Sequence, residues 1–206
     1  MKAATATETP IDAKILQSIR ANRSTSVFSP GHFAHLGSPT AVRKALSRLV
    51  KASKLRRVRQ GLYDLPRQHP IIGQTAPDVE GTVRALMHGS HARWQFSGAY
   101  AANALGLTEQ VPSKIVILTD GVPRDVQLGK LTLVFRRAAP RYLLGAGRPA
   151  GMVIQALRYL KTSAGSPETI ARLRSVLDHP TKTDLATLTP KLPAWMQPIV
   201  QQIKNK

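Results

Sequence analysis

Residues 27–66, VFSPGHFAHLGSPTAVRKALSRLVKASKLRRVRQGLYDLP, decide the expected fold of this chain. The dipeptide Ser-Pro occurs twice in this stretch, at Ser29-Pro30 and at Ser38-Pro39. Serine is a preferred N-cap and proline suits the first helical position, so each dipeptide predicts the start of a helix. The first helix should be short, from Gly31 to Leu36, because Gly37 stops it. The second should run from Pro39 to about Ser53, and the tight turn between them predicts a helix-turn-helix.

The segments on either side complete this motif. Apolar residues recur at helical spacing from Ile11 to Ile19 and predict a preceding helix that ends near Asn22. After the second Ser-Pro helix, two β-prone runs flank Arg59-Gln60-Gly61, and Gly61 can take the left-handed conformation that a three-residue hairpin loop needs. A hairpin directly after a helix-turn-helix is a wing. We therefore expect a winged helix-turn-helix over residues 11–66.

The remainder of the chain reads as a tail, a linker and a second domain. Residues 1–10 are expected to form a flexible tail, and the proline-rich residues 67–77 a linker. Residues 78–206 predict helices over 79–87 and 98–105, strands over 115–118 and 131–135 joined by a connection at 122–129, and helices over 152–162, 167–177, 183–188 and 193–203. The predicted fold class is α+β, with an N-terminal winged helix-turn-helix followed by an α/β C-terminal domain that has a small sheet and several C-terminal helices.

The charge of the chain is strongly positive. Thirty Lys and Arg against eleven Asp and Glu give a net charge of +19 over 206 residues. Such an excess repels itself in the compact state, and its commonest reason is a polyanionic partner, meaning nucleic acid or, less often, an anionic membrane. The absence of cysteine excludes disulfides and Cys-ligated metal sites. With no signal peptide and no run of 18 apolar residues, we expect a cytoplasmic protein without a membrane partner.

Basic and hydroxyl side chains occupy one face of the predicted helix that begins at Pro39, opposite an apolar face, as a DNA recognition helix requires. From Arg43 to Arg59 there are eight basic residues and no acidic one. We expect DNA contacts from Ser38, Thr40, Arg43, Lys44, Ser47, Arg48, Lys51, Arg56, Arg57, Arg59 and Gln60.

These residues have different expected roles. Arg43 can donate two hydrogen bonds to O6 and N7 of a guanine, whereas Thr40 and Ser47 can reach base edges or phosphates. Arg48 and Lys51 are expected on phosphates, and the wing arginines along the backbone or in the minor groove. RNA is the open alternative, because phosphate attraction does not distinguish the two nucleic acids.

No constellation of catalytic residues is evident. The pairs His32/His35 and His88/His91 have a spacing that can hold a metal on a helix, but no third ligand follows and Gly89 interrupts the second pair, so we interpret them as surface or core histidines. Asp120-Gly121 and Asp125 are expected in turns. Phosphate-loop and nucleophile-elbow motifs are missing. We therefore expect no enzyme activity, no catalytic residue, no metal and no cofactor.

Arginines cluster in the second half, around the transition from strands to helices. They are Arg136, Arg137, Arg141, Arg148 and Arg158. Two interpretations stay open for these arginines. They either contribute to the solubility of the whole surface, or they bind an acidic protein or an RNA-handling partner.

Five sequence stretches resemble the AbiEi-like antitoxins of bacterial type IV toxin–antitoxin systems, in the branch labelled DUF6088. In the first half these are FSPGHFAHLGS (residues 28–38, with Phe28-Ser29-Pro30, Phe33 and Leu36-Gly37-Ser38), VRKALSRL (residues 42–49) and RVRQGLY (residues 57–63). In the second half they are FSGAYAANALGLT (residues 96–108) and VPSKIVILTDG (residues 111–121). These two stretches are more specific for the family than those of the first half. The resemblance covers roughly residues 11–180.

The resemblance implies a two-part bacterial protein. The winged helix would bind double-stranded DNA at inverted repeats in its own promoter, in two copies, and repress the operon in the nucleoid. The domain over 78–206 would counter a cognate nucleotidyltransferase toxin of the AbiEii type. A stand-alone winged-helix regulator and an RNA-binding protein are the alternatives.

Overall fold

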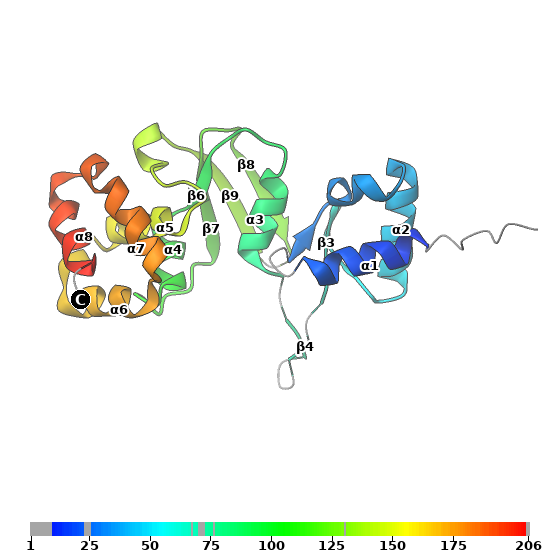
Figure 1. The fold of residues 1–206 in the computed structure, drawn as a ribbon, viewed down its shortest axis with the longest axis horizontal. Helices are drawn as coiled ribbons and strands as arrows, with labels where there is room; N and C mark the ends of the chain where they lie inside the picture. The colour runs from blue at the N-terminus through cyan, green and yellow to red at the C-terminus, as the bar shows by residue number, and fades with distance from the viewer. Residues whose placement is uncertain are drawn as a thin grey trace, which may run out of the picture. The chain divides into compact units, whose positions relative to one another are not determined.

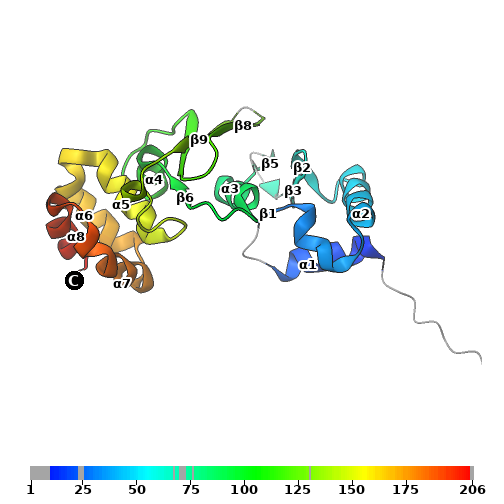
Figure 2. The same cartoon turned by 90° about the horizontal axis from the view of Figure 1, so that it is seen from above.

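The structure is a computed structural model, and it describes residues 10–22, 26–66, 68–69, 73–75, 77–129 and 131–204. The chain is α+β and divides into two compact units, which we call unit 1 (up to Ser90) and unit 2 (from His91). Both are drawn in Figures 1 and 2. No helix among the described residues is long and apolar enough to cross a bilayer.

Unit 2 combines a small mixed sheet with helices. The strand order is β6-β7-β9-β8, with β7 and β9 parallel and both outer pairs antiparallel. The elements of the sheet and its first helix are β6 (Trp94–Phe96), α4 (Gly98–Ala104), β7 (Lys114–Thr119), β8 (Arg124–Leu128) and β9 (Leu131–Arg137). The later elements are η2 (Pro140–Tyr142), α5 (Pro149–Leu160), η3 (Lys161–Gly165), α6 (Pro167–Val176), α7 (His179–Leu188), η4 (Thr189–Lys191), η5 (Ala194–Met196) and α8 (Gln197–Lys204).

The prediction for residues 122–129 was wrong. These residues were expected to connect two strands, but β8 lies there and pairs antiparallel with β9. Charged or polar residues alternate with Val126 and Leu128, so the apolar signal of β8 is short. The strand forms at an edge of the sheet, where backbone pairing with β9 provides its hydrogen bonds. The short strand β6 was likewise not predicted.

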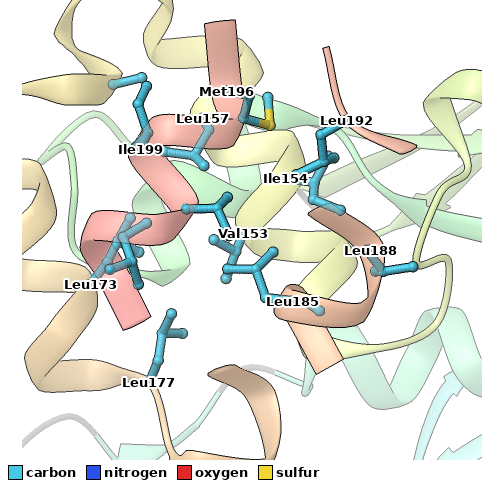
Figure 3. Close-up of a cluster of buried hydrophobic side chains, with 14 of the residues drawn as sticks. Val153, Ile154, Leu157, Leu173, Leu177, Leu185, Leu188, Leu192, Met196 and Ile199 are labelled. Carbon is cyan, nitrogen blue, oxygen red and sulfur yellow. The ribbon is translucent and has the colours of Figure 1, made fainter. Parts of the chain in front are cut away.

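The helices of unit 2 share one apolar core, shown in Figure 3. Val153, Ile154 and Leu157 of α5 are completely buried there. Side chains from α6, α7 and α8 enclose them, among them Leu173, Leu185 and Val200. Burial of each such side chain contributes about 1.5–3 kcal/mol, so this cluster stabilises the helical part of unit 2.

In its described residues, unit 1 has three α or 3-10 helices before its hairpin and one after it. Its elements are α1 (Ile11–Ala21), β1 (Val27–Phe28), the 3-10 helix η1 (Pro30–Leu36), α2 (Pro39–Lys51), β2 (Arg56–Arg59), β3 (Leu62–Asp64), β4 (Gln68–His69), β5 (Gly73–Gln74) and α3 (Val79–Met87). Strands β1, β3 and β2 form an antiparallel sheet in that order, and β4 pairs with β5. The predicted helix starts at Ser29 and Ser38 are confirmed.

The structure divides the chain later than the predicted domain boundary at Asp78. Helix α3 belongs to unit 1, because its Ala85 and Leu86 pack with Val27 and Leu62 of the three-stranded sheet. The pair β4–β5 lies within the predicted linker over 67–77. Residues 1–9 of the predicted tail, and 67, 70–72 and 76 of the predicted linker, lie outside the described residues.

A histidine caps the 3-10 helix that precedes α2. The backbone N–H of Ser29 donates to Nδ1 of His32 over 3.0 Å, which makes Nδ1 an acceptor and assigns the neutral ring. The His88 ring lies 4.5 Å from the His32 ring, centroid to centroid. Burial, and secondarily the proximity of His88, lower the pKa of His32 below its ordinary value of 6.5.

This cap predicts that unit 1 loses stability in mild acid. The folded state binds a proton on His32 less readily than the unfolded chain, so protonation favours unfolding. The contribution is fully present above pH 6.5 and is lost as the pH falls through the lowered pKa. Hydrogen exchange of unit 1 amides at pH 7.5 and pH 5, corrected for the intrinsic exchange rate, should show a drop in protection. The drop should shrink in His32→Asn and persist in the control His35→Asn, whose side chain is exposed; an equal drop in all three proteins would contradict it.

Candidate nucleic-acid interface

Helix α2 presents its basic face to solvent because its other face is buried. The Ser38 hydroxyl accepts a hydrogen bond from the backbone N–H of Ala41 at 3.3 Å and caps the helix. Val42, Leu46 and Leu49 then pack in the core of unit 1 with residues of α1 and η1. The remaining positions point outward, and the exposed side chains are Thr40, Arg43, Lys44, Ser47, Arg48 and Lys51.

Arg48 is exposed but already has a partner. Its Nε donates to Oδ2 of Asp12 at 3.0 Å, and a second nitrogen of the guanidinium pairs with Oδ1. The hydrogen bond from Arg48 holds the pKa of Asp12 below its ordinary value of 3.8. Arg48 therefore ties α2 to the first turn of α1, a role that its sequence position did not predict.

Four residues separate the end of α2 from the start of the β2–β3 hairpin. The backbone N–H groups of Lys54 and Leu55 donate to the Leu49 carbonyl, so the end of the helix is bonded to the start of the hairpin. At the tip, Arg59 pairs with Leu62, so the loop consists of Gln60 and Gly61 and is one residue shorter than predicted. Gly61 has a φ of 77°, the left-handed conformation that the sequence predicted. Three predicted contact residues of the hairpin are exposed: Arg57, Arg59 and Gln60.

Arg56 does not belong to the exposed set, so its surroundings do not support the predicted DNA contact. Its Nε donates to Oδ1 of Asp64 at 2.9 Å, a second nitrogen pairs with Oδ2, and a third donates to the Thr75 carbonyl at 2.6 Å. Strand residues alternate between two faces, and Arg56, like Val58, is partly buried whereas Arg57 and Arg59 are exposed. The hydrogen bond to Asp64 raises the pKa of Arg56.

The exposed cations of unit 1 are short of acidic neighbours. Each described carboxylate in this unit has its own contact: Asp12 with Arg48, Asp64 with Arg56, Glu80 with Arg84, and Asp78 with the first turn of α3. Within the acid-free run 43–59, the cations that form no ion pair with a described carboxylate are Arg43, Lys44, Lys51, Lys54, Arg57 and Arg59. Lys54 was not among the predicted contacts, although it lies within the acid-free run 43–59 that could have indicated it.

The histidine pairs do not gather further ligands. Among residues whose positions the structure describes, no three His, Cys, Asp or Glu side chains come together as a metal site would need. His32 instead stacks against His88. Asp120 accepts from the backbone N–H and from Nε of Arg93, both at 2.8 Å, and joins the start of β6 to the end of β7.

The two neighbouring arginines of β2 should therefore behave differently when replaced. Arg56→Met leaves the Asp64 carboxylate, whose side chain is only 6% exposed, without its cation. We expect a loss of about 2–3 kcal/mol in the free energy of unfolding, below the value for a fully buried pair because Arg56 is partly exposed. Arg57→Met removes the same charge from the surface and should cost less than about 0.5 kcal/mol. Hydrogen exchange of unit 1 amides measures both; similar losses would contradict a structural role for Arg56.

Comparisons with known proteins identify the family of the chain. No curated protein matches it. The crystal structure of the RV2827C protein from Mycobacterium tuberculosis is similar at a TM-score of 0.42 and 14% sequence identity, with 95% of this chain and 78% of that chain covered. A family model described as "Family of unknown function (DUF6088)" matches residues 14–185. Since this match extends over most of both units, the chain belongs to the DUF6088 family.

Proposed function

We propose that the protein is a DNA-binding antitoxin that represses its own operon. Unit 1 would act as a winged helix-turn-helix, with η1 and α2 as the two helices and the β2–β3 hairpin as the wing. Helix α2 would enter the major groove, and the wing would follow the phosphate backbone. The chain itself would catalyse no reaction.

One observation carries the DNA-binding part of the proposal. Six cations on α2, the following turn and the hairpin are exposed and form no ion pair with a described carboxylate, while two further arginines of the same run are used internally. Thr40 and Ser47 lie on the exposed face between the cations of α2, where they can donate to bases or phosphates. An apolar back, a basic front and short hydroxyl side chains are the features of a recognition helix.

The antitoxin part rests on the resemblance of both halves to AbiEi-like proteins. In this hypothesis unit 2 counters a nucleotidyltransferase toxin encoded beside it, and two copies of unit 1 occupy an inverted repeat in the promoter. A regulator without a toxin is the alternative, and an isolated gene would favour it.

Binding to promoter duplexes should separate base-reading residues from phosphate contacts. Arg43→Ala and Ser47→Ala should reduce the preference for the operator over random DNA, with a loss of about 1–3 kcal/mol for a bidentate arginine contact. Arg57→Ala and Arg59→Ala should weaken all duplexes alike and lower the salt slope by about 1 each. With the other five free cations on phosphates, log K of the wild type should fall with log salt at a slope of about −4.5.

Fluorescence anisotropy over a salt series measures these effects, with Arg84→Gln on α3 as the charge-matched control that should bind like the wild type. Equal losses in all five variants would refute the assigned interface. Tighter binding of structured RNA than of the promoter duplex, at one salt concentration, would refute DNA as the partner.

Co-expression tests the antitoxin part separately. The wild-type protein should restore growth to cells that express the neighbouring nucleotidyltransferase. The double variant Arg43→Ala/Arg57→Ala should still restore growth while it fails to repress a promoter reporter, because its substitutions lie on unit 1. Full toxicity in the presence of the wild-type protein would leave repression as the function and overturn the antitoxin assignment.

A further inference from the structure

Unit 2 contains a cavity of about 430 Å³ to which the proposed function assigns no role. Leu118 and Arg137, near the carboxyl ends of the parallel strands β7 and β9, form one side of it. Tyr142 of η2 and Arg158 and Tyr159 of α5 form another. Its size lies in the range of pockets that hold small-molecule ligands, about 300–1,000 Å³.

The charge in this cavity is positive and uncompensated. Nε of Arg158 is buried and has no hydrogen-bond partner, and Nη2 donates to the Arg141 carbonyl at 3.3 Å. Arg137 is exposed and forms no ion pair with any carboxylate that the structure describes. The residues around the cavity include no Asp or Glu.

Burial lowers the pKa of Arg158 below its ordinary value, because a guanidinium charge is poorly solvated there. A half-buried cation without a counter-charge is costly to the folded state. An anion between Arg137 and Arg158 would offset that cost.

Aromatic rings lie beside these cations. The Arg158 guanidinium carbon lies 5.2 Å from the centre of the Tyr142 ring, and that of Arg141 lies 5.0 Å from it. The Tyr142 carbonyl accepts hydrogen bonds from the side-chain amides of Gln95 and Gln155, the latter at 2.7 Å, which fixes this loop. Tyr159 is 42% exposed. Tyrosine rings beside arginines favour a flat ligand that also carries a negative charge.

The backbone keeps the cavity in shape. Gly98, at the start of α4, lies so close to α5 that a Cβ there would be 2.6 Å from the Gln155 carbonyl oxygen and 2.4 Å from Cβ of Tyr159. Helices α4 and α5 therefore meet in direct backbone contact, and Tyr159 and Arg158 are held on a rigid wall.

We propose that this cavity binds a nucleotide, with the phosphate between Arg137 and Arg158 and the base against Tyr142 and Tyr159. The nucleotide is either free or part of a nucleic-acid strand, since both present the same phosphate and base. This site is separate from the proposed DNA-binding face of unit 1, so the two proposals can fail independently.

Isothermal titration of the full-length protein with AMP, GMP and inorganic phosphate tests the site. We expect one nucleotide per chain, with nucleotides bound more tightly than phosphate. Arg137→Ala should weaken nucleotide binding roughly ten- to a hundredfold, as does the loss of a charge-assisted hydrogen bond. Arg158→Met should do the same. Arg136→Ala is the matched control: it removes the same charge from the next position of β9, does not line the cavity, and should leave affinity unchanged.

Two further measurements test whether the site recognises the base and whether the nucleotide is free or part of a strand. Tyr142→Leu should reduce nucleotide affinity toward that of phosphate and leave phosphate binding as it was. A short single-stranded oligonucleotide that displaces AMP would assign the site to a strand, and failure to displace it would assign a free nucleotide. The proposal is overturned if no nucleotide binds, if Arg136→Ala weakens binding as much as Arg137→Ala, or if AMP and phosphate bind equally. In every variant promoter binding should match the wild type, which separates this test from that of unit 1.

Discussion

Burial of one face of α2 is the constraint on which the rest of unit 1 depends. Leu46 is completely buried and Val42 and Leu49 nearly so, in a core completed by Ile15 and Phe33. Removing such side chains from water contributes several kcal/mol in total, far more than any exposed charge interaction could oppose. A rotation of the helix about its axis would expose them. The apolar face therefore fixes which residues of α2 meet solvent, and the basic face follows from it.

The distribution of carboxylates then decides which cations are available. Unit 1 has few acidic residues, and the described ones are used within the fold: Asp12 ties α1 to α2, and Asp64 holds Arg56 on the sheet. Pairing them internally leaves the remaining cations of the run without partners. Such a surface raises the electrostatic free energy of the folded state, and binding of a polyanion relieves that repulsion.

Much of unit 1 could be predicted from its sequence, because its signals are local. The Ser-Pro starts, the period of Val42 to Leu49 and the glycine at position 61 each specify a backbone conformation within a few residues. The role of Arg56 could not be predicted in this way. Its partners Asp64 and Thr75 are 8 and 19 residues away, and only the register of β2 against β3 brings the carboxylate to it. Strand β8 was missed for a similar reason, since its identity depends on pairing with β9.

The residues of the cavity in unit 2 could not be predicted from the sequence either, because they also depend on strand register. Arg137 and Arg158 were recognised as members of a basic cluster, but sequence could not tell which members converge. Arg148 pairs with Asp184, and Arg136 is absent from the cavity that Arg137 lines. The difference between Arg136 and Arg137 is one position on β9, where successive side chains point to opposite faces of the sheet. Net charge thus predicts that a chain meets polyanions, whereas strand register and internal ion pairs determine which arginines are free to do so. In this protein that selection leaves cations without a carboxylate partner on the described part of each unit, and these cations are the basis of the two proposed anion-binding surfaces.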